Sequence, residues 1–126
     1  MFIPLPDYPQ PFGTRKICVG TFQGSVAYLQ GGGNDVLTAS QLGWGSIDEV
    51  RGSVSFNANN AGNYSASALY PVGQSPRVAN NNVQGNPPQL TACAQVQFKW
   101  IAANGTEAAN NTNLSSEFAR VSIIGG

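Results

Sequence analysis

The chain has 126 residues and a formal net charge of zero, with six basic and six acidic residues and no histidine. This length supports one domain with one hydrophobic core. Charged residues make up 10% of the chain, against about 25% in an average soluble domain, and the basic residues form no patch. These features argue against nucleic-acid binding through phosphate contacts. No apolar run reaches the ~20 residues of a transmembrane helix, so we expect no membrane partner.

The absence of histidine narrows the chemistry further. A Ser-His-Asp or Cys-His nucleophile is impossible, and two cysteines are too few ligands for a structural zinc site. A carboxylate pair is the main hydrolytic route left, but Asp48 and Glu49 are adjacent and would point to opposite faces of a strand. Asp35, Glu107 and Glu117 fall in predicted loops or at a strand end, where we expect solvated carboxylates. We therefore predict no enzyme activity and no metal ion or cofactor.

The N-terminal segment, residues 1–13, holds four of the eight prolines, which excludes both a helix and a central strand. We predict an extended, polyproline-like arm here and a β-sandwich domain over residues 14–126. The arm is apolar, unlike a disordered tail. It either folds back over its own domain or lies across a neighbouring subunit, and proline stiffness, which lowers the ordering cost of binding, favours the second. The predicted partner-binding residues are Phe2, Ile3, Leu5, Tyr8 and Phe12.

The stretch Met1 to Asp7 lacks the basic region and the long apolar run of a signal peptide. We therefore expect a chain that stays in the cytosol or leaves by a route that needs no such signal. Thiols stay reduced in that compartment. Cys18 and Cys93 are accordingly interpreted as two small buried residues, with one disulfide across the domain as the alternative.

The first strand is predicted at residues 14–23, where apolar residues alternate, and Gly24 ends it. Residues 25–29 predict a second short strand, and residues 31–35 a flexible turn. The three glycines of this turn are not followed by the lysine and helix of a phosphate-binding loop.

The only helix-like piece is Val36–Gly43. Thr38 has the side chain to cap a single turn that runs through Gln41, and Gly43 is suited to end that turn.

Further strands are predicted on both sides of a long loop. Residues 46–56 form one strand with a bulge at Gly52, and residues 64–70 form the next. Residues 71–89 have no periodicity, and a loop of this length is often functional.

The C-terminal part is expected to hold the most buried apolar surface. Residues 95–101 and 118–124 alternate as half-buried strands. We predict that they form an antiparallel hairpin joined by a long exposed loop, which begins at Asn104-Gly105 with a type I′ turn. Six to eight short strands separated by Gly, Asn and Pro clusters predict an all-β, single-domain antiparallel β-sandwich or a jelly-roll-like barrel.

Aromatic side chains offer one binding alternative. A sugar-stacking platform would need them exposed on one face, whereas we expect most of them in the core or at a subunit interface. The residues concerned are Tyr28, Trp44, Tyr64, Tyr70 and Trp100.

Short pieces of the sequence resemble small structural proteins of tailed phages. In those proteins a Gly-Thr-Glu turn, a Leu-Ser pair and an Arg-Val…Gly end follow a strand with an aromatic or apolar residue and lysine. The matching pieces cover about a third of the chain. They are Val36–Gly43, Ile47–Val50, Phe98–Trp100, Gly105–Ala109, Thr112–Ser115 and Ala119–Gly125.

This resemblance implies a virion protein of the head decoration or cement type. Such a protein, commonly a trimer, binds the outside of the assembled capsid and bridges neighbouring copies of the major capsid protein. It would be assembled in the host cytoplasm and located on the capsid surface. The alternative is a carbohydrate- or receptor-binding β-sandwich module of a tail appendage or adhesin. A third hypothesis is a ring-forming tail-completion or connector protein.

Overall fold

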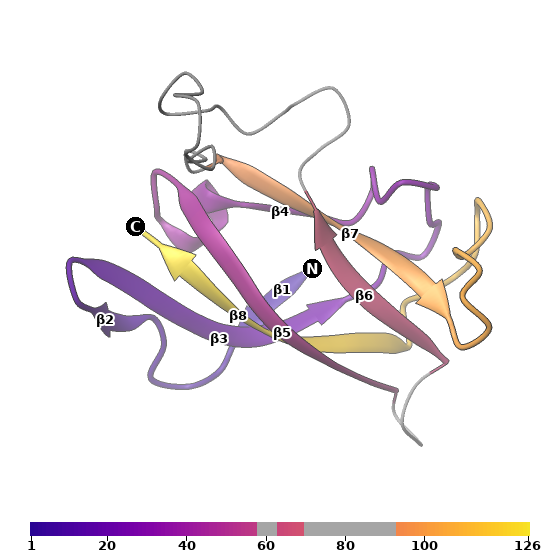
Figure 1. Ribbon diagram of the computed structural model, residues 1–126, viewed down its shortest axis with the longest axis horizontal. Helices are drawn as coiled ribbons and strands as arrows, with labels where there is room; N and C mark the ends of the chain where they lie inside the picture. The colour runs from indigo at the N-terminus through magenta and orange to yellow at the C-terminus, as the bar shows by residue number, and fades with distance from the viewer. Residues whose placement is uncertain (58–62, 70–92) are drawn as a thin grey trace, which may run out of the picture.

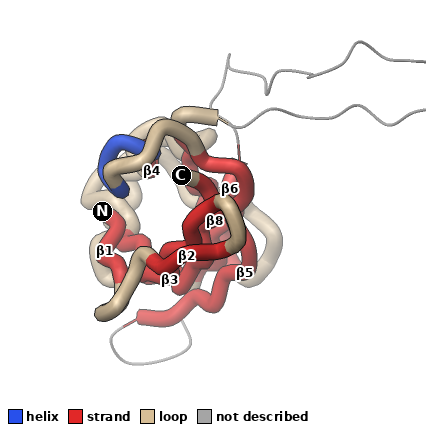
Figure 2. Tube along the Cα trace, turned by 90° about the vertical axis from the view of Figure 1, so that its left-hand side faces the viewer, coloured by secondary structure: helices blue, strands red, loops and turns tan. Residues whose placement is uncertain are grey.

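Two antiparallel sheets pack face to face and form an all-β sandwich, as the sequence predicts (Figures 1 and 2). The computed structural model describes residues 1–57, 63–69 and 93–126. The five-stranded sheet has the order β1-β3-β8-β5 with β2 also paired to β3, and the three-stranded sheet has the order β4-β7-β6. The strands are β1 (Phe2–Pro4), β2 (Gln10–Phe12), β3 (Arg15–Gln23), β4 (Val36–Thr38), β5 (Ile47–Asn57), β6 (Tyr64–Leu69), β7 (Gln95–Ala102) and β8 (Glu117–Gly125).

The core lies between the sheets and follows the period-two patterns of β3 and β8. Cys18 pairs with Ile123 and Phe22 with Ala119, and all four side chains are buried. Phe22 meets Phe98 of β7 with the ring centroids 4.2 Å apart, which joins the two sheets across the core. Alternation therefore predicted correctly which face of these strands is buried.

The capped turn is confirmed in detail. Ala39–Leu42 form a 3₁₀ turn, η1, and the Thr38 side chain accepts a hydrogen bond from the Gln41 N–H while the Gln41 side chain accepts one from the Thr38 N–H. Gly43 follows with φ +72°, the left-handed conformation that favours glycine. The predicted bulge is also present, because the β5–β8 register shifts between Arg51 and Val54, around Gly52.

The predicted hairpin of the C-terminal part is wrong. β7 belongs to the three-stranded sheet and β8 to the five-stranded sheet, so the connection crosses from one sheet to the other. Most of this connection is exposed, as predicted, but Ala108 and Leu114 are buried in the core. Its backbone is held by hydrogen bonds from the Ala108 N–H to the Trp100 carbonyl and from the Leu114 N–H to the Ser25 carbonyl.

Two local predictions are also wrong. The turn at Asn104-Gly105 has a positive φ only at Gly105, whereas a type I′ turn needs one at both central residues. Residues 25–29 form no strand but the start of a loop, residues 24–35, whose backbone is hydrogen-bonded to the connection between β7 and β8. The prediction for residues 71–89 falls outside the described residues.

The N-terminal segment lies along β3 of its own chain as the two short strands β1 and β2 (Figure 1). Met1 and Gln23 exchange two backbone hydrogen bonds, and the Leu5 N–H donates to the Val19 carbonyl. The predicted polyproline-like arm is thus replaced by edge strands, and of the two alternatives the structure shows the fold-back. Odd-numbered residues bond to β3, so Pro4 sits where an N–H would point away from the sheet. An edge strand tolerates proline at such a position.

Candidate protein-binding surface

In the part of the chain that the structure describes, five large apolar side chains are exposed, and all of them belong to the first 29 residues. Single exposed apolar residues are ordinary, whereas several that lie together mark a binding surface. Ile3 and Phe12 lie opposite Thr21 and Arg15, near the two ends of β3, so the five residues share the N-terminal part of the chain rather than one patch. We call this group the N-terminal apolar surface. Its members, with their exposed fractions, are Met1 (69%), Ile3 (52%), Phe12 (46%), Val26 (69%) and Leu29 (48%).

The five residues predicted to bind a partner divide between two faces of the N-terminal edge. Phe2 lies opposite Phe22 of β3 and packs against the core, as does Tyr8. Ile3 lies opposite Thr21, which faces outward, and is exposed. The same alternation that predicts strands explains this division, because neighbouring side chains of β1 point to opposite faces.

Phe12 and Leu5 complete the predicted set. Phe12 pairs with Arg15 at the other end of β3 and is exposed, while Leu5 is half-buried. Two of the five predicted side chains, Ile3 and Phe12, therefore remain available to a partner, and two others support the fold.

Val26 and Leu29 were missed because residues 25–29 were interpreted as a strand. In that interpretation Val26 and Tyr28 share a face, but Tyr28 is buried whereas Val26 and Leu29 are exposed. A spacing of three between the exposed residues, next to Gly24 and the glycines at 31–33, is the signal for a loop that was available in the sequence.

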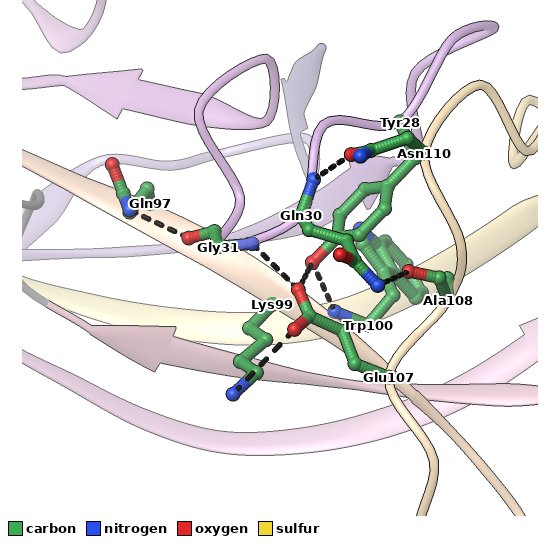
Figure 3. Close-up of polar contacts among 9 residues, drawn as sticks. All are labelled: Tyr28, Gln30, Gly31, Gln97, Lys99, Trp100, Glu107, Ala108 and Asn110. Atoms are coloured by element: carbon green, nitrogen blue, oxygen red, sulfur yellow. Dashed lines mark hydrogen bonds and ion pairs between the residues drawn. The ribbon is translucent and has the colours of Figure 1, made fainter.

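Glu107 holds this loop in place (Figure 3). Its Oε2 accepts hydrogen bonds from the Tyr28 hydroxyl at 2.7 Å and from the Gly31 N–H at 2.6 Å. Its Oε1 lies 3.7 Å from the Lys99 ammonium. We call these four residues the Glu107 latch. Hydrogen bonds to an ionised acceptor are stronger than neutral ones, so the latch fixes the loop against β7 and the segment after it.

Further hydrogen bonds tie the same loop on both sides (Figure 3). The Asn110 side-chain oxygen accepts from the Gln30 N–H at 2.7 Å, and the Gln97 amide donates to the Gly31 carbonyl at 2.6 Å. The Tyr28 hydroxyl accepts from the Trp100 N–H at 3.3 Å. The loop therefore presents Val26 and Leu29 from an ordered backbone.

The expectation of solvated carboxylates is wrong for three residues. Asp35 and Glu117 are buried, and Glu107 is half-buried. Asp35 accepts from the Trp100 indole N–H at 2.8 Å and from the Ser25 N–H at 3.2 Å, and Glu117 accepts from the Asn63 N–H at 3.1 Å. Loops that leave a sheet have backbone donors without a ladder partner, and these carboxylates supply the acceptors.

Asp48 and Glu49, two of the three remaining acidic side chains, are paired on the surface. Asp48 accepts two hydrogen bonds from the Arg15 guanidinium, at 2.6 and 2.8 Å, and Glu49 pairs with Arg51 at 3.0 Å. Across residues 1–57, 63–69 and 93–126, no three His, Cys, Asp or Glu side chains come close enough together to hold a metal ion. The same part of the chain has no helix with the length and hydropathy to cross a membrane.

No family model, curated protein or solved structure matches the chain. Its function is therefore inferred from the surface and from the sequence.

The aromatic platform is contradicted for three of its members. Tyr28, Trp100 and Trp44 are all buried, with exposed fractions of 1%, 0% and 6%. Tyr64 is half-buried and packs against the core, and Tyr70 lies outside the described residues. Stacking on a sugar ring needs an open aromatic face, which the buried side chains do not offer.

Both cysteines are free thiols, so the disulfide alternative is not observed. Cys18 is buried and Cys93 is half-buried. Burial raises the pKa of both thiols and so keeps them in the less reactive protonated form.

The Glu107 latch makes stability depend on pH in the acidic range. The hydrogen bond from the Gly31 N–H, followed by those from Tyr28 and the charge of Lys99, lowers the pKa of Glu107 from its ordinary value of 4.5. A carboxyl with a lowered pKa in the folded state stabilises the fold above its unfolded-state pKa, and this contribution is lost as the pH falls through the folded-state pKa.

We therefore expect the difference in unfolding free energy between the native protein and Glu107→Gln to be constant near neutral pH. It should shrink below about pH 4.5. Urea denaturation of both proteins across this pH range measures the difference. The other carboxyl groups titrate in both proteins, so their contributions to the unfolding free energy cancel in the difference. A difference that stays constant down to the acid transition would contradict the role given to ionised Glu107.

Proposed function

We propose that the protein decorates an assembled viral capsid from the outside and stabilises it by bridging neighbouring copies of the major capsid protein. The observation that carries this proposal is the N-terminal apolar surface on a chain with little charge to oppose association. The resemblance of the C-terminal pieces to small phage structural proteins supports the same class.

Mass action supplies the mechanism. A ligand that binds only the assembled lattice stabilises it by RT ln(1 + [L]/Kd) for each site. Many symmetric copies on one shell multiply this small contribution, and no bond-making chemistry is needed. The order of the loop that carries Val26 and Leu29 favours binding, because less conformational freedom is lost on docking.

The carbohydrate-binding alternative has less support. It depends on aromatic side chains that face solvent, and Trp44, Trp100 and Tyr28 are buried. After Met1, Ile3 is the most exposed large apolar residue of the N-terminal segment, and Val26 is the most exposed one of the loop at residues 24–35. Both side chains are aliphatic and suit an apolar protein surface better than a sugar.

Substitution of aspartate for Ile3 or Val26 should weaken capsid binding roughly tenfold or more, because an unpaired charge would be buried in the interface. Stability should change by no more than about 0.5 kcal/mol, since both side chains are exposed. The measurement is co-sedimentation of the purified chain with heads that lack it, after light scattering has established whether the chain is a trimer.

Ser65→Asp provides a matched control, because Ser65 is exposed on β6 of the other sheet. It should bind as the native protein does. The proposed function is overturned if the native chain neither sediments with heads nor raises their melting temperature. If Ile3→Asp and Val26→Asp bind heads as strongly as the native protein does, the N-terminal apolar surface is not part of the interface.

A further inference from the structure

We propose that the N-terminal segment, residues 1–12, is an exchangeable strand, which docks on β3 of a second copy of the chain when copies are held close together. The occupant of the β3 edge is then the identical segment of a neighbour. This exchange needs only two copies of the chain, so it can be tested independently of capsid binding.

The first step is that the backbone hydrogen bonds between the segment and β3 do not depend on chain continuity. Met1 exchanges two hydrogen bonds with Gln23, at 3.0 and 2.7 Å, and the Leu5 N–H donates to the Val19 carbonyl at 2.8 Å. The same segment from another copy satisfies these groups equally well. Exchange of an identical element is a low-cost route to association for this reason.

The second step is a specific socket. Gly20 has no side chain, and a Cβ built there would overlap the Phe2 ring and lie 2.6 Å from the Ile3 carbonyl oxygen. The ring of Phe2 therefore occupies the space above Gly20, on the same face of the sheet as the buried Phe22. This socket fixes the register of any segment that docks, because a slip by one residue would turn Phe2 to the outer face.

The third step concerns the hinge. Phe12 and Arg15 are paired, so Gly13 and Thr14 form a two-residue turn between β2 and β3. Gly13 has φ +63° and no atom within 4 Å of the position of a Cβ, while Thr14 has no positive φ. This is the pattern of a type II′ turn, which requires glycine at its first central position. Opening the turn to an extended backbone releases the segment without breaking a packed contact at Gly13.

Neighbouring copies supply the condition for exchange. In an isolated chain, docking on its own β3 benefits from an effective concentration in the millimolar range, so the closed form dominates in dilute solution. Copies fixed side by side, or concentrated to a similar level, meet the segment of a neighbour as often as their own. Exchange then links the copies through a complete strand.

Cross-strand cysteines test the exchange directly. Ile3 and Thr21 are Cα partners in the β1–β3 register, and opposed residues of this kind are within disulfide reach. Chains that carry only Ile3→Cys are refolded and concentrated together with chains of different mass that carry only Thr21→Cys, both with Cys93→Ser. Under mild oxidation, a segment docked on a neighbour's β3 gives a disulfide between residues 3 and 21 of different chains in excess of the disulfide between two residues 3, which colliding surface cysteines also form.

We expect this interchain product to rise with protein concentration, while a chain that carries both cysteines closes within itself when dilute. Gly13→Ala should raise the ratio of interchain to intrachain product roughly tenfold, because alanine is strained at a positive φ in the closed turn only. Gly105→Ala is the matched control, since Gly105 also has a positive φ in an open turn, far along the chain from the segment. It should leave the ratio unchanged.

The double-cysteine chain first has to form its intrachain disulfide, which shows that residues 3 and 21 can react. If concentrated chains with the native Gly13 then give no interchain product, the proposal is overturned. This comparison does not depend on the folding of Gly13→Ala. Equal ratios in the Gly13→Ala and Gly105→Ala chains would overturn the assignment of Gly13 as the hinge.

Discussion

Replacing Glu107 by alanine should lower the free energy of unfolding by about 3 kcal/mol, because two hydrogen bonds to an ionised acceptor are lost and each contributes about 1.5–3 kcal/mol. The Tyr28 hydroxyl and the Gly31 N–H would both lose their acceptor. Urea denaturation at neutral pH measures the change. The loop that carries Val26 and Leu29 should also exchange its amide hydrogens faster near Gly31, since the Gly31 N–H has lost its acceptor.

Glu49→Ala is the matched control, because Glu49 forms an exposed ion pair with Arg51. Such a pair contributes about 0–1 kcal/mol. Tyr28→Phe, alone and combined with Glu107→Ala, separates the contribution of the hydroxyl, and the two changes should be clearly non-additive. Equal losses for Glu107→Ala and Glu49→Ala would show that the latch adds nothing beyond a surface charge.

The second large effect is expected from Gly20→Ala. The new methyl group would overlap the Phe2 ring and the Ile3 carbonyl, so β1 must leave β3. Loss of a packed phenylalanine and of the edge hydrogen bonds should cost about 2–4 kcal/mol of unfolding free energy. Limited proteolysis should then cut the chain within residues 1–12, where the native protein resists.

Gly45→Ala is the control for a glycine that tolerates a methyl group, because the nearest atom to a Cβ there is 3.8 Å away. It should change neither stability nor proteolysis appreciably. Phe2→Ala in the Gly20→Ala chain should not restore the edge pairing, since the backbone carbonyl oxygen of Ile3 would still lie 2.6 Å from the new Cβ. If Gly20→Ala keeps its N-terminal segment protected, the socket does not hold β1.

Local patterns were sufficient to predict much of the fold. The alternation of β3, β7 and β8 and the Thr38–Gln41 capping box depend on residues close in the chain, and the structure confirms them. The sheet to which each strand belongs depends on long-range pairing, which alternation does not encode. For this reason β7 and β8 were predicted as a hairpin, although they lie in opposite sheets.

The candidate surface was predictable only in part. An apolar, proline-rich segment identified Ile3 and Phe12, but the assignment of Phe2 and Tyr8 to the core needed the register with β3. Glu107 was unpredictable as an anchor, because its donors lie on Tyr28 and Gly31, more than 70 residues earlier in the chain. Polar side chains that satisfy distant loop backbones leave no periodic signal in the sequence.

The proline in β1 has a further consequence for a chain with no net charge. β proteins without net charge are prone to join edge to edge into fibrils at high concentration, since no long-range repulsion separates the copies. At Pro4 the outer edge of β1 has no amide hydrogen to offer an incoming strand. The β1 edge of the larger sheet is therefore a poor template for an added strand at this position.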